Sequence, residues 1–226
     1  MNRTIPPAIA AIAPDGKLTP AQKRHLIINL SLKRAKPGTG SCHEFLRRRT
    51  AMKLWPDLRP ILQDITWVIV GDVATRAYMP ERETKDLDIL VHHEDGEETI
   101  ERLQAAGYRI ISRLAVPGYL LMSPEGIQLD VIFGDYPWLK QALQNHHQDK
   151  ADYPVLGLSY LVLMKTVAGR IQDTADVSRM LGLATDEELN QVRAVVKRYE
   201  PEAVDDLESM IYLGQLEMQF PDDHVN

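Results

Sequence analysis

The sequence has a single cysteine, Cys42, among its 226 residues. One cysteine excludes a disulfide within the chain and is typical of a reducing compartment, so we expect a cytoplasmic protein. Cys42 is interpreted as an ordinary small residue rather than a nucleophile, because only the adjacent His43 could activate its thiol.

Long apolar runs are also missing. No run reaches the roughly 18 residues that a membrane-spanning helix needs, so we expect no membrane partner. Residues 5–14 are apolar but contain Pro6, Pro7 and Pro14, which argues against a signal peptide. Length and composition instead fit a soluble globular protein with one compact domain and an appendage.

Positive charge is scarce beyond the first 60 residues. Residues 1–60, called the basic arm here, hold 12 of the 26 Lys and Arg but 3 of the 32 Asp and Glu, a balance of +9. The other residues hold 14 basic and 29 acidic side chains, a balance of −15. Two interpretations stay open. The arm binds RNA, tRNA or an acidic protein, or it packs on the chain's own acidic body or on a second protomer of a homo-oligomer.

The centre of the chain has two predicted strands. Residues 67–70 form an apolar run that stops at Gly71 and predicts a buried strand. Residues 86–91 alternate at their start, so Asp86 and Asp88 point to the same side. Two adjacent carboxylates repel each other, and Lys85 is the only cationic neighbour. A hard divalent cation such as Mg²⁺ would relieve the repulsion. The alternative is an aspartate pair on the solvated face of an edge strand.

A third carboxylate belongs to a predicted hairpin. Residues 118–123 and 127–133 flank a turn at Pro124-Glu125-Gly126. Asp130 would face the side of Asp86 and Asp88 if the two strands are neighbours.

Other elements follow from capping and periodicity. His92 and His93 end the second strand and are interpreted as strand-end residues rather than ligands of one metal ion, because neighbouring strand side chains point in opposite directions. A further strand is expected at residues 108–115. Helices are expected at residues 19–35, 41–52, 73–79, 95–106, 137–148, 159–168, 185–199 and 201–217.

At these residues the chain resembles the nucleotidyltransferase superfamily, whose fold is shared with DNA polymerase beta. The family pattern is an apolar strand, a glycine turn, a spacer of about ten residues, Asp-apolar-Asp and a later Asp on a neighbouring strand. Here the pattern is met by Gly71, Asp86, Asp88 and Asp130. Residues 82–88 resemble the bacterial branch of AbiEii-type toxins and small antibiotic nucleotidyltransferases, and the resemblance covers about residues 65–181.

The resemblance implies an α+β (α/β-like) nucleotidyltransferase fold with a small mixed sheet and flanking helices. Its parts would be a basic helical appendage at residues 1–60, a catalytic core at 61–150 and a C-terminal helical region at 151–226. The implied activity transfers an NMP from a Mg²⁺-bound NTP to an acceptor hydroxyl of RNA or tRNA, a small molecule or a protein.

The resemblance also assigns roles to individual residues. Asp86, Asp88 and Asp130 would be catalytic and would hold two Mg²⁺ ions, with Asp130 helping to deprotonate the hydroxyl. The implied nucleotide-binding residues are Gly71, Asp72, Arg76, Lys85, Lys165 and Arg170.

Asp72 departs from the family pattern, which has a small residue after the glycine. A carboxylate there would repel a triphosphate unless a metal ion or Arg76 compensates. The alternative function is therefore a catalytically weak or inactive protein of this fold that binds a nucleotide, RNA or a partner, as in toxin–antitoxin pairs.

Lys165 is the only charge in the apolar residues 159–168, where a lysine usually snorkels to water. The resemblance instead implies that it contacts phosphates. In the segment that follows, Asp173 and Asp176 share one helix face and are expected to cap the helix and to pair with Arg170 or Arg179.

Overall fold

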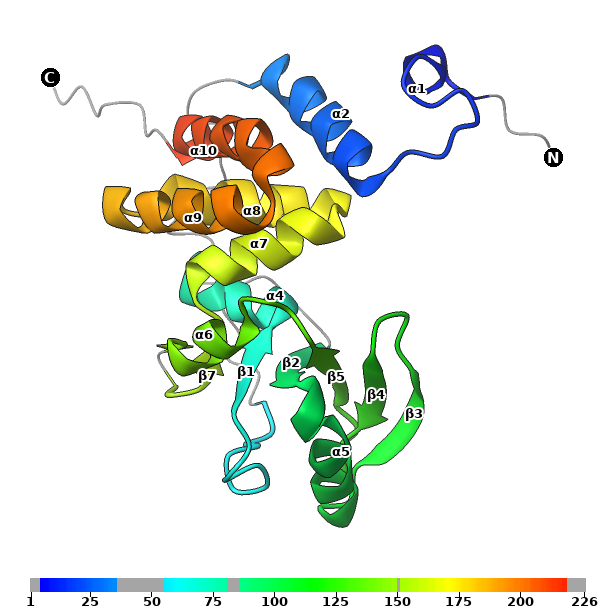
Figure 1. The fold of residues 1–226 in the computed structure, drawn as a ribbon, viewed down its shortest axis with the longest axis vertical. Coiled ribbons are helices and arrows are strands. Elements are labelled where there is room, and N and C mark those ends of the chain that lie inside the picture. The colour runs from blue at the N-terminus through cyan, green and yellow to red at the C-terminus, as the bar shows by residue number, and fades with distance from the viewer. Residues whose placement is uncertain (1–4, 36–54, 81–85, 150, 219–226) are drawn as a thin grey trace, which may run out of the picture. The chain divides into compact units, whose positions relative to one another are not determined.

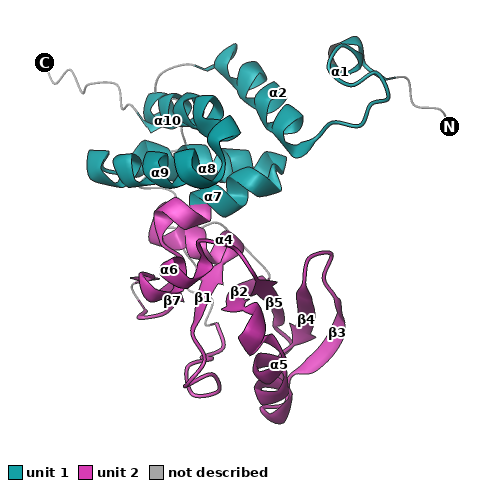
Figure 2. Cartoon of the chain, in the orientation of Figure 1, with its two compact units in different colours: residues 1–40, 162–226 teal, residues 41–161 magenta. Residues whose placement is uncertain are grey.

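The computed structural model describes residues 5–35, 55–80, 86–149 and 151–218. Contacts between Cα atoms divide the chain into two compact units (Figure 2). The sheet unit comprises residues 41–161, and the helical unit comprises residues 1–40 and 162–226. The described residues 5–35 thus belong with the C-terminal helices. The expected division at residues 60 and 150 stays a prediction.

The sheet unit is built on one seven-stranded sheet with the order β3-β4-β5-β2-β1-β7-β6 (Figure 1). β2 pairs with β5 and β1 with β7 in parallel, while the remaining neighbours are antiparallel. This mixed sheet with its flanking helices confirms the predicted fold class. The strands are β1 (Trp67–Val70), β2 (Asp86–His92), β3 (Arg109–Arg113), β4 (Gly118–Met122), β5 (Gln128–Gly134), β6 (His147–Gln148) and β7 (Pro154–Val155).

The hydrophobic core of the sheet unit lies on its central strands. All four residues of β1 are buried, and so are Leu87 and Ile89 of β2 and Leu129 and Val131 of β5. The helical elements are α4 (Gly71–Ala74), η1 (Thr75–Ala77), η2 (His93–Asp95), α5 (Gly96–Ala105), α6 (Leu139–Gln144) and the first part of α7 (Leu158–Ala168).

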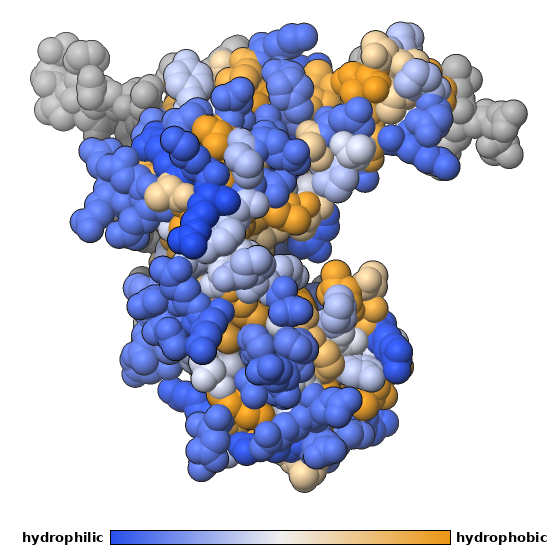
Figure 3. Space-filling model, in the orientation of Figure 1, coloured by the Kyte–Doolittle hydropathy of each residue, from blue (hydrophilic) through white to orange (hydrophobic). Residues whose placement is uncertain are grey.

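In contrast to the buried central strands, every residue of the edge strand β3 is exposed. Figure 3 shows a mainly hydrophilic surface with smaller hydrophobic patches. The exposed large hydrophobic residues of the sheet unit include Ile110, Ile111 and Val116, on β3 and on the turn that leads to β4. The predicted β4–β5 hairpin is confirmed by its antiparallel register, in which Leu120 pairs with Asp130.

The helical unit packs α2 against α8 and α10. The helices α8 and α10 approach so closely that a Cβ atom on Gly214 would lie 1.9 Å from the Ser178 carbonyl oxygen. Thr185 forms the predicted capping box with Glu188, and Thr19, predicted as an N-cap, forms one with Gln22. The unit contains α1 (Pro7–Ala10), α2 (Pro20–Leu32), the end of α7, α8 (Ile171–Leu183), α9 (Asp186–Tyr199), η3 (Pro201–Ala203) and α10 (Val204–Met218).

Several predicted elements need correction. The helix expected at residues 137–148 ends at Gln144, and His147 instead pairs with Val155 in a short antiparallel ladder. The helix expected at residues 73–79 begins at Gly71 and tightens into the 3₁₀ turn η1 after Ala74. The helix expected at residues 41–52 lies outside the described residues. None of the helices in the described ranges combines the length and apolar character that crossing a membrane requires.

Candidate active site

Gly71 joins β1 to α4 and lies against Asp88. The antiparallel register pairs Val70 with Asp88, which brings the end of β1 to the start of β2. Gly71 has a φ of +64°, and a Cβ atom built on it would lie 2.1 Å from Oδ2 of Asp88. Only glycine therefore combines this left-handed turn with room for the Asp88 carboxylate.

The three predicted catalytic aspartates lie on two neighbouring strands. The parallel β2–β5 register pairs Asp88 with Asp130 and places Asp86 beside Gln128. All three aspartates are half-buried, whereas Leu87 and Leu129, which alternate with them, are buried. The condition stated for Asp130, that its strand neighbours the Asp86–Asp88 strand, is met.

The electrostatic environment of Asp130 is unfavourable for a bare carboxylate. Burial, and then the negative charge of Asp86, raise the pKa of the Asp130 carboxyl above its ordinary value. Half-buried carboxylate oxygens of like charge are the donor chemistry that Mg²⁺ prefers, so this set fits the ion that the resemblance implies. These three side chains are not among the groups of described residues whose ligand atoms already lie within 4.8 Å of one another. Lys85, the neighbouring cation, lies outside the described residues.

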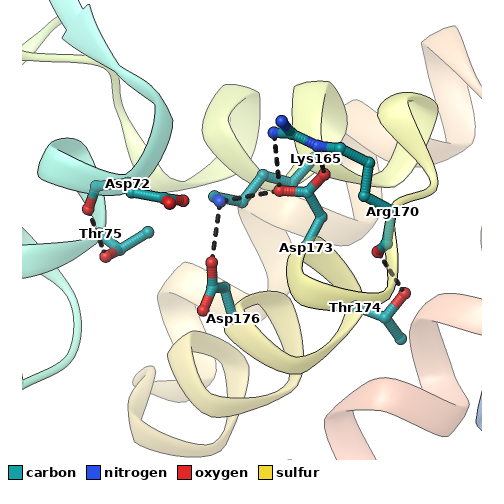
Figure 4. A network of polar contacts seen from close by, with 7 residues as sticks. All are labelled: Asp72, Thr75, Lys165, Arg170, Asp173, Thr174 and Asp176. Carbon is teal, nitrogen blue, oxygen red and sulfur yellow. Dashed lines mark hydrogen bonds and ion pairs between the residues drawn. The ribbon is translucent and has the colours of Figure 1, made fainter. Parts of the chain in front are cut away.

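Asp72 and Arg76 lie on the turn that follows Gly71. Asp72 is half-buried in the first turn of α4, and its backbone carbonyl accepts a hydrogen bond of 2.7 Å from Oγ1 of Thr75 (Figure 4). Arg76 donates from Nε to Oδ2 of Asp149 at 2.8 Å, and its guanidinium carbon lies 5.8 Å from the centre of the Tyr153 ring. Arg76 is thus anchored within the sheet unit, and its contact with a nucleotide stays a prediction.

Lys165 is held between two carboxylates in the helical unit (Figure 4). Its Nζ donates to Oδ1 of Asp173 and to Oδ2 of Asp176, both at 3.0 Å. The side chain is 3% exposed, so the expectation that it snorkels to water is wrong. Burial alone would lower the pKa of Lys165, but the charges of Asp176 and Asp173 outweigh it, and the pKa is raised.

Arg170 completes this cluster. Its Nε donates to Oδ2 of Asp173 at 2.6 Å, which confirms the predicted pairing of Asp173 with Arg170. The expected capping is wrong, because among the described residues no side chain caps the N-terminus of α8. Asp176 is bound by Lys165 instead of by Arg179, because α7 brings a cation from outside the segment that the motif spans. Two carboxylates thus face two cations. The implied roles of Lys165 and Arg170 in nucleotide binding stay predictions.

Sequence reasoning missed Asp149, the partner of Arg76. Asp149 also accepts hydrogen bonds from the backbone N–H groups of Ala151 and Tyr153, so it organises the chain before β7. It lies far from Arg76 in the sequence and follows a polar stretch without periodicity, so no local pattern indicates its role.

A search against protein-family models found no match, and a search of curated protein sequences found none either. Similar solved structures include ANT(2″)-Ia in complex with adenylyl-2″-tobramycin, at 15% identity and a TM-score of 0.39, over 66% of this chain and 88% of that chain. The lincosamide antibiotic adenylyltransferase LnuA, lincomycin-bound, has 15% identity and a TM-score of 0.39, over 62% and 90% of the two chains. The Thermotoga maritima CCA-adding enzyme complexed with tRNA has 12% identity and a TM-score of 0.35, over 76% and 50%.

The narrower AbiEii branch stays a prediction. The similar structures are nucleotidyltransferases, the superfamily that the sequence resembles.

Proposed function

We propose that the sheet unit is a Mg²⁺-dependent nucleotidyltransferase core that transfers an NMP from an NTP to an acceptor hydroxyl. The observation that carries the proposal is the pairing of Asp88 with Asp130 beside a glycine turn that leaves room for one side chain, the Asp88 carboxylate. A carboxylate pair of this kind costs electrostatic energy without a cation, so a structural role explains it poorly.

Each site residue has its own role in the proposed reaction. Asp86, Asp88 and Asp130 would hold Mg²⁺, which when bound neutralises phosphate charge and stabilises the attacking and leaving oxygens. Gly71 has no side chain, so it leaves room for the Asp88 carboxylate and would let the backbone approach the phosphates. Asp130 would accept the proton of the acceptor hydroxyl as a general base. Positioning and charge neutralisation supply most of the rate acceleration.

Binding of each NTP, with and without Mg²⁺, tests the proposal by titration calorimetry. We expect the wild type to bind at least one NTP only when Mg²⁺ is present, and Asp88→Asn to bind it at least about tenfold more weakly. Asp64→Asn is the matched control, because its side chain is 87% exposed and the same charge is removed away from the cluster. The proposal is wrong if no NTP binds at millimolar concentration, or if Asp88→Asn binds as the wild type does.

Asp130→Asn separates binding from chemistry. If Asp130 acts as the base, this variant retains a larger share of nucleotide binding than Asp88→Asn. Transfer of labelled NMP to an RNA or small-molecule acceptor pool, however, falls by at least about a hundredfold. Equal transfer by Asp130→Asn and the wild type would remove Asp130 from the mechanism.

Asp72 favours a second candidate function, a nucleotide- or partner-binding protein of the same fold with little or no catalysis. Its half-buried carboxylate follows Gly71 directly, where a triphosphate would otherwise meet only a small side chain. Asp72→Ser tests this alternative. If the variant gains nucleotide affinity or transfer activity over the wild type, Asp72 suppresses catalysis in the natural chain. If activity falls, Asp72 takes part in it.

A further inference from the structure

His92, His93 and Asp135 form a second cluster of metal-ligating side chains in the sheet unit. One ligand atom from each residue lies within 4.8 Å of those of the other two. Nδ1 of His93 lies 3.7 Å from Oδ1 of Asp135, and the two imidazole rings are 4.8 Å apart between centroids. Donors around one tetrahedral zinc ion are about 3.4 Å apart, so small rotations of these side chains suffice.

The sheet register explains why these residues meet. β2 and β5 are parallel neighbours, and His92 is paired with Gly134, the last residue of β5. The residues that follow, His93 and Asp135, therefore leave the sheet side by side. The expectation that His92 and His93 point in opposite directions is wrong, because β2 ends at His92 and the 3₁₀ turn η2 begins at His93. The turn brings the second imidazole back to the first.

Glu94 lies beside this cluster and can orient one ligand. Nδ1 of His92 is 3.5 Å from Oε2 of Glu94 and accepts the Glu94 backbone N–H at 3.4 Å. Because Nδ1 accepts this N–H, it does not donate to the Glu94 carboxylate at the same time. Metal binding through Nε2 requires the other tautomer, in which Nδ1 carries the proton and donates it to the Glu94 carboxylate instead of accepting the backbone N–H. A carboxylate behind a ligating histidine is the usual arrangement in metal sites, where it fixes the tautomer.

We propose that His92, His93 and Asp135 bind a divalent transition-metal ion such as Zn²⁺. Two imidazoles and one carboxylate are the donors that zinc prefers, whereas Mg²⁺ favours oxygen ligands alone. The side chains are accessible, with exposed fractions of 29% for His92, 49% for His93 and 80% for Asp135. Three protein ligands leave one position for water or for a group from another molecule.

This site is separate from the aspartates of the proposed function. His92 lies four residues beyond Asp88 on the same strand, about 13 Å along it at the usual rise per residue. The ion would therefore hold the far ends of β2 and β5 together. The proposal does not depend on nucleotidyl transfer, and it survives if that activity is absent.

Zinc titration of the tag-free chain at pH 7.5, by calorimetry in excess Mg²⁺, tests the proposal. We expect one equivalent of Zn²⁺ to bind the wild type, and the double variant His92→Gln with His93→Gln to bind at least about tenfold more weakly. His146→Gln with His147→Gln is the matched control, since it removes the other adjacent histidine pair of the sheet unit. The control and Asp88→Asn should bind zinc as the wild type does.

Asp135→Asn guards against a trivial loss of fold, because its side chain is largely exposed. We expect this variant to keep the wild-type melting temperature without metal, to bind Zn²⁺ more weakly, and to lose most of the rise in melting temperature that Zn²⁺ gives the wild type. Two results would overturn the proposal. One is no zinc binding at millimolar concentration. The other is equal zinc binding by the wild type, the histidine variant and Asp135→Asn, which would leave these residues as solvated strand ends.

Discussion

Gly71 is constrained both by its positive φ and by the nearby Asp88 carboxylate, and a comparison with Gly126 separates the two effects. Gly71 and Gly126 both have positive φ, +64° and +81°, but a Cβ atom on Gly126 would meet nothing within 4 Å. Gly126→Ala should therefore lower the free energy of unfolding by about 1–2 kcal/mol from backbone strain alone. Gly71→Ala should lower the free energy of unfolding by more than Gly126→Ala does, because its methyl group displaces the Asp88 carboxylate. For the same reason it should abolish Mg²⁺-dependent nucleotide binding. Urea unfolding and calorimetry measure the two effects. Equal losses of unfolding free energy in the two variants, with nucleotide binding retained by Gly71→Ala, would contradict this account.

Lys165 should be required for stability whatever its part in binding. Removing it leaves Asp173 and Asp176 buried at 1% and 0% exposure with one cation fewer, so Lys165→Met should cost about 3–5 kcal/mol at pH 7. Its raised pKa means that the ammonium contributes fully at pH 7, and that the contribution is lost only as pH rises through the folded-state pKa, above the ordinary value of 10.5.

A triple variant provides the control for Lys165. Lys165→Met combined with Asp173→Asn and Asp176→Asn removes the charge conflict, so it should lose less stability in urea than Lys165→Met alone. A larger loss in the triple variant would show that the carboxylates stabilise the helices through contacts other than the one with Lys165.

Tyr108 gives a pH-dependent prediction at high pH. Burial, and then the charge of Glu125, raise the pKa of Tyr108 to about 12, whereas an unfolded tyrosine ionises near 10. Above pH 10 the unfolded chain loses this proton first, so the stability of the folded protein falls as pH rises. Tyr108→Phe should remove up to about 2–3 kcal/mol of that loss between pH 10 and 12. Urea unfolding at several pH values checks this, and parallel pH profiles for the variant and wild type would refute it.

The site residues show which positions can be predicted from local sequence pattern and which cannot. Strand alternation suffices to place Asp86 and Asp88 on one side of their strand, because the period of a strand is fixed. That the strand of Asp130 lies beside them is a condition, and only the sheet order of the structure meets it. Lys165 could not be placed in this way. An apolar helix with one lysine has the same sequence whether the lysine reaches water or meets carboxylates of a later helix, so only the tertiary structure decides.

At the level of elements, the sequence predicts where α2 begins but not that one of its charged residues is buried. Thr19 and Pro20 predict where the helix begins, and Thr19 caps it as expected. Counting charge, however, treats Arg24 as part of a basic surface, whereas it is 2% exposed and donates to Asp206 of α10 at 2.7 Å and to the Thr166 carbonyl at 2.7 Å. Arg24 therefore supports the interpretation that part of the basic arm packs on the chain's own acidic body.

Arg24→Met tests this docking. Because the change leaves Asp206 buried without its guanidinium partner, we expect the free energy of unfolding to fall by about 3–5 kcal/mol. Lys23→Met is the control at the neighbouring exposed position, and it should change stability by no more than about 0.5 kcal/mol. Similar effects of the two substitutions in urea unfolding would mean that the Arg24–Asp206 contact does not hold α2 in place.

Elements that depend on residues outside their own segment were the ones mispredicted. The ladder at His147–Gln148 exists because β7 lies beside it, and two residues are too few to give a periodic pattern. The turn at His93 likewise depends on where the sheet ends. In contrast, α9 carries its own start signal in Thr185 and Glu188 and matches the prediction from Asp186 to Tyr199.

For the molecule as a whole, the open question is what the uneven charge does. Deleting residues 1–60 is a poor test, because the deletion removes α2 from its contacts with α8 and α10 and would destabilise the helical unit. Substitution of exposed basic residues avoids this problem. Lys23, Lys33 and Arg34 are exposed in the arm, and Lys140, Lys197 and Arg198 are exposed elsewhere, so the two triple glutamine variants change the net charge equally.

If the arm binds a polyanion, the wild type should bind tRNA with an affinity that falls steeply with salt. The variant of Lys23, Lys33 and Arg34 should reduce the slope of log K against log salt by about 0.7–0.9 for each phosphate that the protein no longer neutralises. The variant of Lys140, Lys197 and Arg198 should leave the slope unchanged, because residues 61–226 carry a net charge of −15 and repel phosphate. Equal slopes for both variants, or no tRNA binding by the wild type at low salt, would assign the positive charge to packing within the chain or between protomers, as the burial of Arg24 already indicates for one residue.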